Sequence, residues 1–154
     1  TGIILAGRTG ASYAAVIGTM QVNEEIDALT TLGVAPSDYL IMPRVLALTA
    51  MTPLLVLYSD FMGIMGGFIV GVGILGLDPM ETQKGFNINN LWVGMVHGAV
   101  YGMLIAITGC YQGLRCGRNA EAVGKATTSA VVYSIVGIVL STAVLTILCN
   151  ILNI

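Results

Sequence analysis

Four long apolar segments, residues 1–20, 45–77, 91–111 and 126–152, set the strongest constraint on the fold of this chain. A helix of about 20 residues crosses a bilayer, so each segment is long enough for one crossing. Only 9% of the residues are charged, whereas a soluble domain carries about 25%. The sequence therefore predicts an all-α integral membrane protein with about four transmembrane helices.

The apolar segments carry small residues at every fourth position. In lipid, such stripes let the backbones of two helices approach closely. The second segment is also longer than one straight crossing requires, so Pro53 predicts a kink or a strong tilt there. The expected packing positions are Gly10 and Gly18 in the first segment, Gly63, Gly67 and Gly71 in the second, and Gly94, Gly98 and Gly102 in the third.

An acidic segment at residues 18–36 (GTMQVNEEIDALTTLGVAP) separates the first two apolar segments and predicts a short amphipathic helix. Asn23 is a favourable N-cap, the carboxylates that follow suit the positive end of the helix dipole, and Gly33 is expected to end the helix. This helix is either an ordinary solvated loop helix or a docking element for a soluble partner. The residues assigned to docking are Asn23, Glu24, Glu25, Asp27 and Leu29.

The distribution of basic residues predicts the orientation in the membrane. The acidic helix and the hydrophilic loop at residues 112–125 face the same side, since two crossings separate them. Together with Arg44, that side holds four basic residues, against Lys84 alone on the other. The positive-inside rule then places the acidic helix in the cytoplasm and the C-terminus outside.

The sequence contains no recognisable catalytic motif. GxSxG, Walker A, HExxH and EF-hand patterns are absent, and one histidine with three scattered cysteines predicts no metal site. A net charge of −2 argues against nucleic acid as a partner. The chain is therefore expected to be no enzyme and to hold no metal or cofactor of its own.

Polar residues inside the apolar segments are candidates for function, because intramembrane charge is costly. Arg8 either has such a role or extends its head group to the interface. His97 either relays protons or only bonds a neighbouring helix. Asp60 lies three residues before a stripe glycine and is expected to point into protein or a wet cavity. The full set is Arg8, Asp60, His97 and Thr142.

The run AGRTGASYAAVIGTMQVNEEIDALTTLGVAPSDYLIMPRVLA (residues 6–47) resembles the signature of the MlaE-type permeases, the membrane subunits of phospholipid ABC transporters. The resemblance continues through PLLVLYSDFMGIMGG (residues 53–67), GCYQGLRCGRNAEAVGKATTSAVV (residues 109–132) and the last apolar segment. It implies that residues 1–154 are one permease domain. It also implies that the chain is the C-terminal portion of a subunit, without the family's N-terminal interfacial helix and first span.

The resemblance further implies partners. The acidic helix corresponds to a cytoplasmic coupling helix that docks on an ABC ATPase, which binds the ATP. A homodimer of permeases would hold phospholipid in the bacterial inner membrane, together with a periplasmic MCE-domain subunit and in some systems a STAS-domain protein.

Three positions depart from the family pattern. Relatives usually carry a glutamate at Val16, a lysine at His97 and often an aspartate at Thr142. Intramembrane charges are normally kept in compensating sets. These positions are therefore expected to form one contact network, in which this chain replaces an ionic set by a neutral, hydrogen-bonded one. Independent drift at the three positions is the alternative.

Two other functions are compatible with the same residues. An ion-coupled secondary transporter or channel would use Arg8, Asp60 and His97 as an internal charge pathway. A membrane scaffold would use the acidic helix only to recruit a protein. Dependence on an ATPase partner and transfer of lipid between vesicles separate these alternatives from a permease.

Overall fold

The structure, a computed structural model, describes residues 1–74, 76 and 88–152, and every element among them is a helix. The prediction of an all-α chain is therefore confirmed. In chain order the elements are α1 (Gly2–Leu5), the π-helix η1 (Ala6–Gly10), α2 (Ala11–Val22), α3 (Glu25–Thr31), the π-helix η2 (Ser37–Ile41), α4 (Met42–Gly73), α6 (Ile88–Leu114) and α7 (Ala120–Leu152). Because α1, η1 and α2 follow one another without a break, they form one helical segment, and η2 runs into α4 in the same way.

Three helices in the described part of the chain are long and apolar enough to cross a membrane, namely Ser37–Gly73, Leu91–Leu114 and Ala120–Ile151. The N-terminal helical segment is not one of them, since Arg8 and its polar neighbours lower its hydropathy. The expected fourth crossing therefore stays a prediction. Helix α4 continues through Pro53 to Gly73. Large apolar side chains are exposed along all the long helices, as expected where lipid is the solvent.

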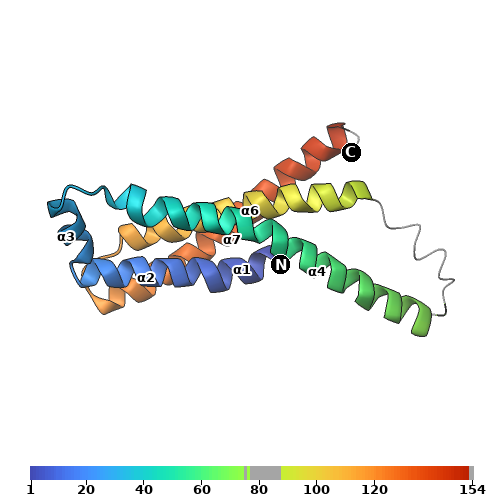
Figure 1. The fold of residues 1–154 in the computed structure, drawn as a ribbon. Coiled ribbons are helices and arrows are strands. Elements are labelled where there is room, and N and C mark those ends of the chain that lie inside the picture. The colour runs from blue at the N-terminus through green and yellow to red at the C-terminus, as the bar shows by residue number, and fades with distance from the viewer. Residues whose placement is uncertain (75, 77–87, 153–154) are drawn as a thin grey trace.

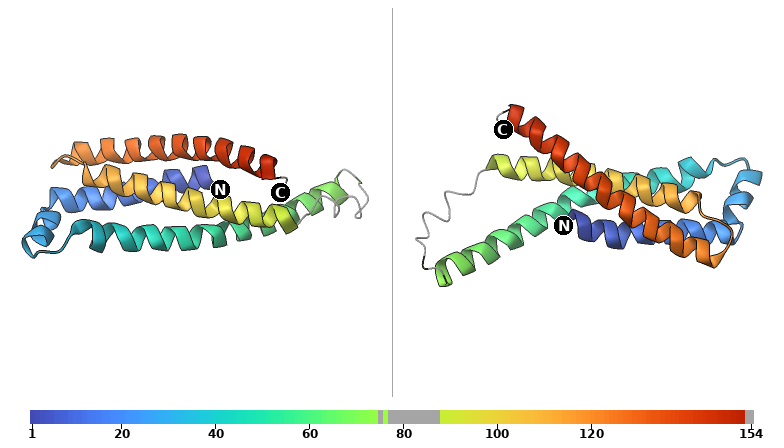
Figure 2. Two further views of the ribbon diagram at one scale, coloured as in Figure 1. Left: turned by 90° about the horizontal axis from the view of Figure 1, so that it is seen from above. Right: turned by 180° about the vertical axis from the view of Figure 1, so that it is seen from behind.

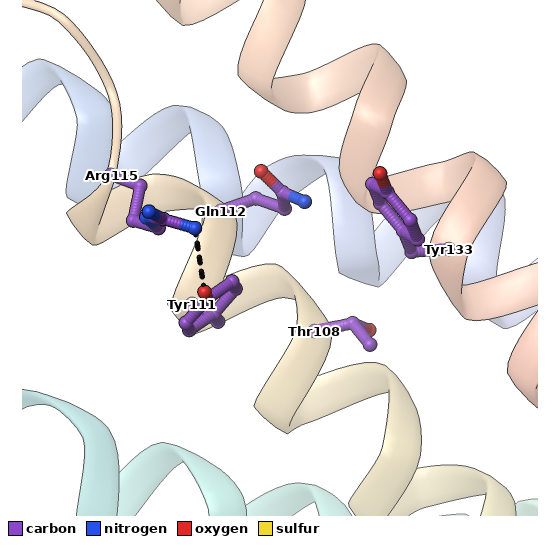
Figure 3. Close-up of a pocket in the computed structure, with 5 residues that line it drawn as sticks. All are labelled: Thr108, Tyr111, Gln112, Arg115 and Tyr133. Carbon is purple, nitrogen blue, oxygen red and sulfur yellow. Dashed lines mark hydrogen bonds between the residues drawn. The ribbon is translucent and has the colours of Figure 1, made fainter.

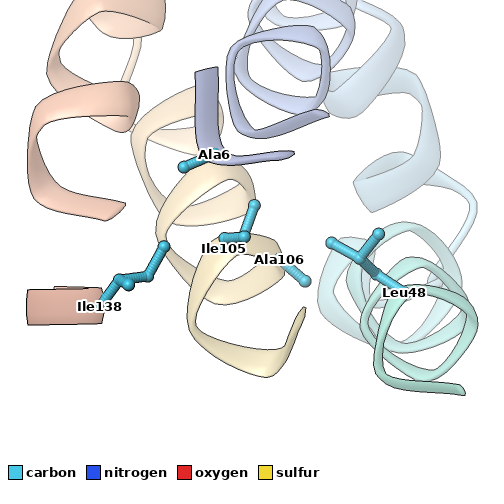
Figure 4. Close-up of a cluster of buried hydrophobic side chains, with 5 residues drawn as sticks. All are labelled: Ala6, Leu48, Ile105, Ala106 and Ile138. Atoms are coloured by element: carbon cyan, nitrogen blue, oxygen red, sulfur yellow. The ribbon is translucent and has the colours of Figure 1, made fainter. Parts of the chain in front are cut away.

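Helix α6 is the centre of the bundle, because it contacts the N-terminal helical segment, α4 and α7. Near α3 the N-terminal helical segment, α4, α6 and α7 run side by side, whereas the C-terminal part of α4 diverges from the others (Figures 1 and 2). The core where these four helical segments meet is small and apolar, as Figure 4 shows. It consists of Ala6, Leu48, Ile105, Ala106 and Ile138.

Glycines on α6 allow this helix to pack closely against α4. A Cβ at Gly98 would lie 2.9 Å from Val56 Cγ2, and one at Gly102 would lie 3.0 Å from the carbonyl oxygen of Leu48. Gly94 belongs to the same stripe and faces α4 as well. The small residues expected on this stripe thus lie where two helix backbones come closest.

The same helix packs against α2 through two glycines outside the predicted stripe. A Cβ at Gly109 would lie 2.9 Å from the carbonyl oxygen of Gly10, and one at Gly113 would lie 2.7 Å from Ile17 Cβ. These glycines continue the small stripe beyond Ala106, which is fully buried. One stripe of small residues along α6 therefore packs against α4 in its first half and against α2 in its second half.

The glycines of the first and second segments differ. A Cβ at Gly10 would contact Ile105 and the Ser134 hydroxyl, and Gly18 lies against Cys116. By contrast, Gly63 and Gly67 meet nothing within 4 Å in the described part of the chain, although Gly71 is buried. The packing expected at Gly63 and Gly67 is therefore not made among the described residues, because the part of α4 that carries them diverges from the bundle.

Hydroxyl groups inside the helices are satisfied by the helices themselves. Thr52 donates to the carbonyl oxygen of Leu48 at 2.5 Å, and Thr142 donates to that of Ile138 at 2.6 Å. Such bonds spanning four residues remove the cost of placing a hydroxyl in an apolar medium. Polar residues can thus lie inside a membrane helix without marking a binding site.

Candidate functional site

Helix α3 is held against the bundle by its apolar face. Ile26 is 6% exposed and packs with Ile17 of α2, Leu40 of η2 and Cys110 of α6. Leu29 is half-buried against the same cluster. Burying a side chain of this size stabilises by about 1.5–3 kcal/mol. The position of α3 is therefore fixed by three different elements of the bundle.

The two ends of α3 differ in how far they match the sequence prediction. Asn23 was expected to be the N-cap, but it is the residue that ends α2, and Glu24 occupies the cap position with a φ of 61°. A two-residue turn between helices leaves no room for a separate cap, so the chain reverses through a left-handed residue. Gly33, with a φ of 76°, ends the helix as predicted, since its N–H bonds the Thr30 carbonyl oxygen and the next N–H bonds that of Leu29.

The acidic face of α3 is partly neutralised by a residue outside the predicted docking set. Arg118, in the loop between α6 and α7, donates from Nη2 to Asp27 Oδ2 at 2.6 Å, and its Nη1 lies 3.9 Å from Glu24 Oε1. Glu25 lies outside this ion pair, is exposed, and accepts a 3.4 Å hydrogen bond from Asn23. Only the charge pattern of the sequence could have indicated this ion pair, because it places a basic loop on the same side as an acidic helix.

Both charged segments lie at the same end of the bundle. Figure 1 shows α3 at the end where the loop between α6 and α7 turns back, and the ion pair joins the two. An acidic helix and a basic loop on one side are what the charge pattern requires. Which side of a membrane this is remains a prediction.

Arg8 lies beside a cavity near the N-terminus. The cavity has a volume of about 480 Å³ and opens between the N-terminal helical segment and α4. Its surface is mainly apolar, with polar groups from Thr1, Arg8, Thr9 and Ser59. The side chain of Arg8 is exposed rather than enclosed in the bundle.

Asp60 and His97 both face other protein groups. Asp60 Oδ2 lies 3.3 Å from the position that a Cβ of Gly94 would occupy, so the carboxylate faces α6 as expected. The His97 Nδ1 is 2.8 Å from the Val93 carbonyl oxygen. None of the ion pairs found among the described residues joins Asp60 to Arg8.

Of the two contacts expected around His97, the structure shows the one toward Thr142 but not the one toward Val16. The His97 ring packs edge-on against Tyr101 with centroids 5.8 Å apart, and the Tyr101 hydroxyl is 2.7 Å from Thr142 Oγ1. His97 thus reaches Thr142 through Tyr101, which was not among the predicted residues. Val16 is 43% exposed, and its helical neighbour Ile17 contacts Gly113. That glycine is 16 residues, about 24 Å along α6, from His97. The inclusion of Val16 was therefore wrong.

Comparison with known proteins identifies relatives. A model of the family described as "Permease MlaE" matches residues 1–148. A probable ABC transporter permease protein of Rickettsia typhi is 43% identical over 149 residues, which cover 94% of this chain and 58% of the relative. A probable ABC transporter permease protein of Synechocystis sp. is 39% identical, with 92% of this chain and 55% of the relative covered.

A plant protein is similar as well. The Arabidopsis thaliana protein named "TRIGALACTOSYLDIACYLGLYCEROL 1, chloroplastic" is 36% identical over 149 residues, which cover 94% of this chain and 43% of the relative. The chain thus spans about half the length of the curated relatives it matches.

Proposed function

The chain belongs to the MlaE permease family, and we propose that it moves phospholipid between the inner and outer membranes of a bacterium as the membrane subunit of an ABC transporter. A separate ATPase would bind and hydrolyse the ATP. The permease would supply the path for the lipid and the surface on which the ATPase docks.

Two observations support a lipid as the cargo. The name of the plant relative contains a glycolipid. The cavity beside Arg8 combines a mainly apolar surface with the polar groups of Thr1, Arg8, Thr9 and Ser59, which suits a molecule with acyl chains and a polar head. Transport of this kind requires binding and conformational change but no bond making by the permease.

The observation that carries the docking proposal is the placement of α3. It is a short acidic helix outside the long apolar helices, fixed by Ile26 and flanked by Arg118. Glu25 is exposed at its N-terminal end. A rigid, negatively charged helix of this kind is suited to a basic groove on a soluble ATPase. We place this end in the cytoplasm and the C-terminus in the periplasm, in line with the positive-inside rule.

The remaining partners follow from the family. We propose a homodimer in the inner membrane that works with a periplasmic MCE-domain subunit and, in some systems, a STAS-domain protein. The divergent part of α4 supports a second copy. Gly63 and Gly67 meet nothing within 4 Å in the described part of the chain, and Phe61 and Ile69 beside them are exposed.

A charge reversal on α3 tests the docking role. Glu25→Lys in the full-length subunit keeps the Arg118 ion pair, so α3 should stay in place. The variant should lower ATP-driven lipid transport by tenfold or more, since juxtaposed like charges cost several kcal/mol. Transport is measured as transfer of labelled lipid between vesicles by the assembled complex.

The matched control is Glu121→Lys, which reverses an exposed carboxylate at the same end of the bundle but on α7. It should leave transport within twofold of the wild type. Unchanged transport by a correctly inserted Glu25→Lys protein would show that α3 is not the docking element.

A further inference from the structure

A second cavity lies beside α6, near the end of the bundle that carries α3. It has a volume of about 420 Å³ and opens between α6 and α7. Three of its lining residues lie on α6, the fourth directly follows the end of α6, and the fifth comes from α7, as Figure 3 shows. The lining consists of Thr108, Tyr111, Gln112, Arg115 and Tyr133.

The side chains in this cavity offer hydrogen-bond donors. Arg115 donates from Nη1 to the Tyr111 hydroxyl at 2.7 Å, and its Cζ lies 5.4 Å from the centre of the Tyr111 ring. The guanidinium is therefore held in place by a hydrogen bond and a cation–π contact. Because the Tyr111 oxygen accepts this bond, its own proton can be donated to another acceptor. Gln112 and Tyr133 add an amide and a second phenol.

The charge balance of the cavity favours an anion. None of its lining residues is acidic. The other two basic residues in the loop region, Arg118 and Lys125, each have a carboxylate partner within 4.0 Å, and none of the ion pairs among the described residues includes Arg115. A guanidinium with several remaining N–H groups matches the geometry of phosphate oxygens.

The level of the cavity along α6 indicates which kind of phosphate reaches it. The apolar span of α6 ends at Leu114, and the lining runs from two turns before that residue to one position after it. Tyr111 and Tyr133 are 52% and 58% exposed at this level. Tyrosine and arginine at the end of a span lie at the level of lipid head groups.

We propose that this cavity binds the phosphate of a membrane phospholipid in the leaflet at the α3 end of the bundle. Arg115 provides the charge and a forked pair of donors, while Tyr111, Gln112 and Tyr133 provide further hydrogen bonds. Thr108 forms the floor, since its hydroxyl is already bonded to the Leu104 carbonyl oxygen and to Ser134. The inference depends on the proposed insertion in a membrane but not on transport.

Lipid retention by the full-length subunit tests the site. The protein is reconstituted in nanodiscs of phosphatidylcholine with a minor fraction of phosphatidylglycerol, extracted into detergent, and the retained phosphatidylglycerol is counted by native mass spectrometry. Arg115→Gln should lower retention about tenfold, on the scale of a lost charge-assisted contact. Tyr111→Phe should lower it by a smaller factor. Lys125→Gln is the matched control, because it removes one positive charge at the same end outside the cavity, and it should change retention less than twofold.

Further arms identify the source of the phosphate. Diacylglycerol, which lacks phosphate, should not be retained, and millimolar inorganic phosphate should not displace phosphatidylglycerol. Displacement by inorganic phosphate would assign the cavity to a free anion and overturn the proposal. Full retention by Arg115→Gln, or equal losses in Arg115→Gln and Lys125→Gln, would overturn it too. If the wild-type complex retains lipid in this cavity but transports none between vesicles, the proposed function is contradicted and the lipid site still stands.

Discussion

The ion pair between Arg118 and Asp27 allows a quantitative prediction, because it joins two segments that are 91 residues apart. The side chains of Arg118 and Asp27 are 59% and 47% exposed, so solvent screens most of their attraction despite the short distance. Exposed pairs of this kind contribute about 0.2–1 kcal/mol. The contact to Glu24, at 3.9 Å and with a more exposed partner, adds less.

A double-mutant cycle isolates this contribution. Arg118→Ala and Asp27→Ala should each raise the fraction of molecules in which α3 is detached from the loop. The expected coupling of about 0.2–1 kcal/mol corresponds to a factor of about 1.4–5 in that equilibrium. The burial of Ile26 should keep α3 attached to the rest of the bundle in both variants.

Hydrogen exchange of the α3 amides in nanodiscs measures this equilibrium, since exchange reports local opening. Protection should fall by the predicted factor in each single variant and by no more than that in the double variant. Asn119→Ala is a control, because its side chain caps α7 in the same loop by accepting a bond from the Ala122 N–H, and none of the side-chain hydrogen bonds found among the described residues joins it to α3. Additive losses in the double variant, or unchanged protection in Arg118→Ala, would refute the reasoning.

Two further predictions concern packing and orientation. Gly98→Ala should lower the thermal midpoint of the full-length protein in detergent, because the new Cβ would lie 2.9 Å from a valine methyl on α4 and overpacking costs about 1–3 kcal/mol. Gly63→Ala, where nothing lies within 4 Å among the described residues, should not lower it, and equal shifts would contradict the packing. An impermeant thiol reagent should label Ala120→Cys only after spheroplasts are opened. Labelling of intact spheroplasts would reverse the proposed orientation. The native Cys116 should react slowly on either side, because burial raises the pKa of its thiol.

The fold class and the C-terminal end of α3 followed from the sequence because the governing signals are local. Apolar runs of sufficient length predict helices in lipid, and Gly33 marks the end of α3 by the one conformation that favours glycine. The N-terminal end of α3 was less predictable. Whether Asn23 or Glu24 begins the helix depends on how α2 ends, which is set by the close approach of the two helices.

Contacts between helices could be predicted only in part. The stripe from Gly94 to Gly102 predicted close packing but not its partner, and the same signal at Gly63 and Gly67 corresponds to no contact in the described part of the chain. A stripe reports that one face is bare, whereas the partner depends on the tertiary arrangement. Arg118 and Tyr101 were missed for the same reason, since neither belongs to a local pattern and each acts through a residue distant in sequence.

The two attachments of α3 differ in strength, and this difference has a mechanical consequence. Ile26 joins α3 to α2, η2 and α6 through buried apolar contacts, at about 1.5–3 kcal/mol. Arg118 joins it to the loop before α7 through an exposed ion pair, at about 0.2–1 kcal/mol. A force applied to α3 would break the weaker attachment first. We infer that a partner pulling on α3 acts on the bundle mainly through Ile26 and the elements packed around it, and less through the loop before α7.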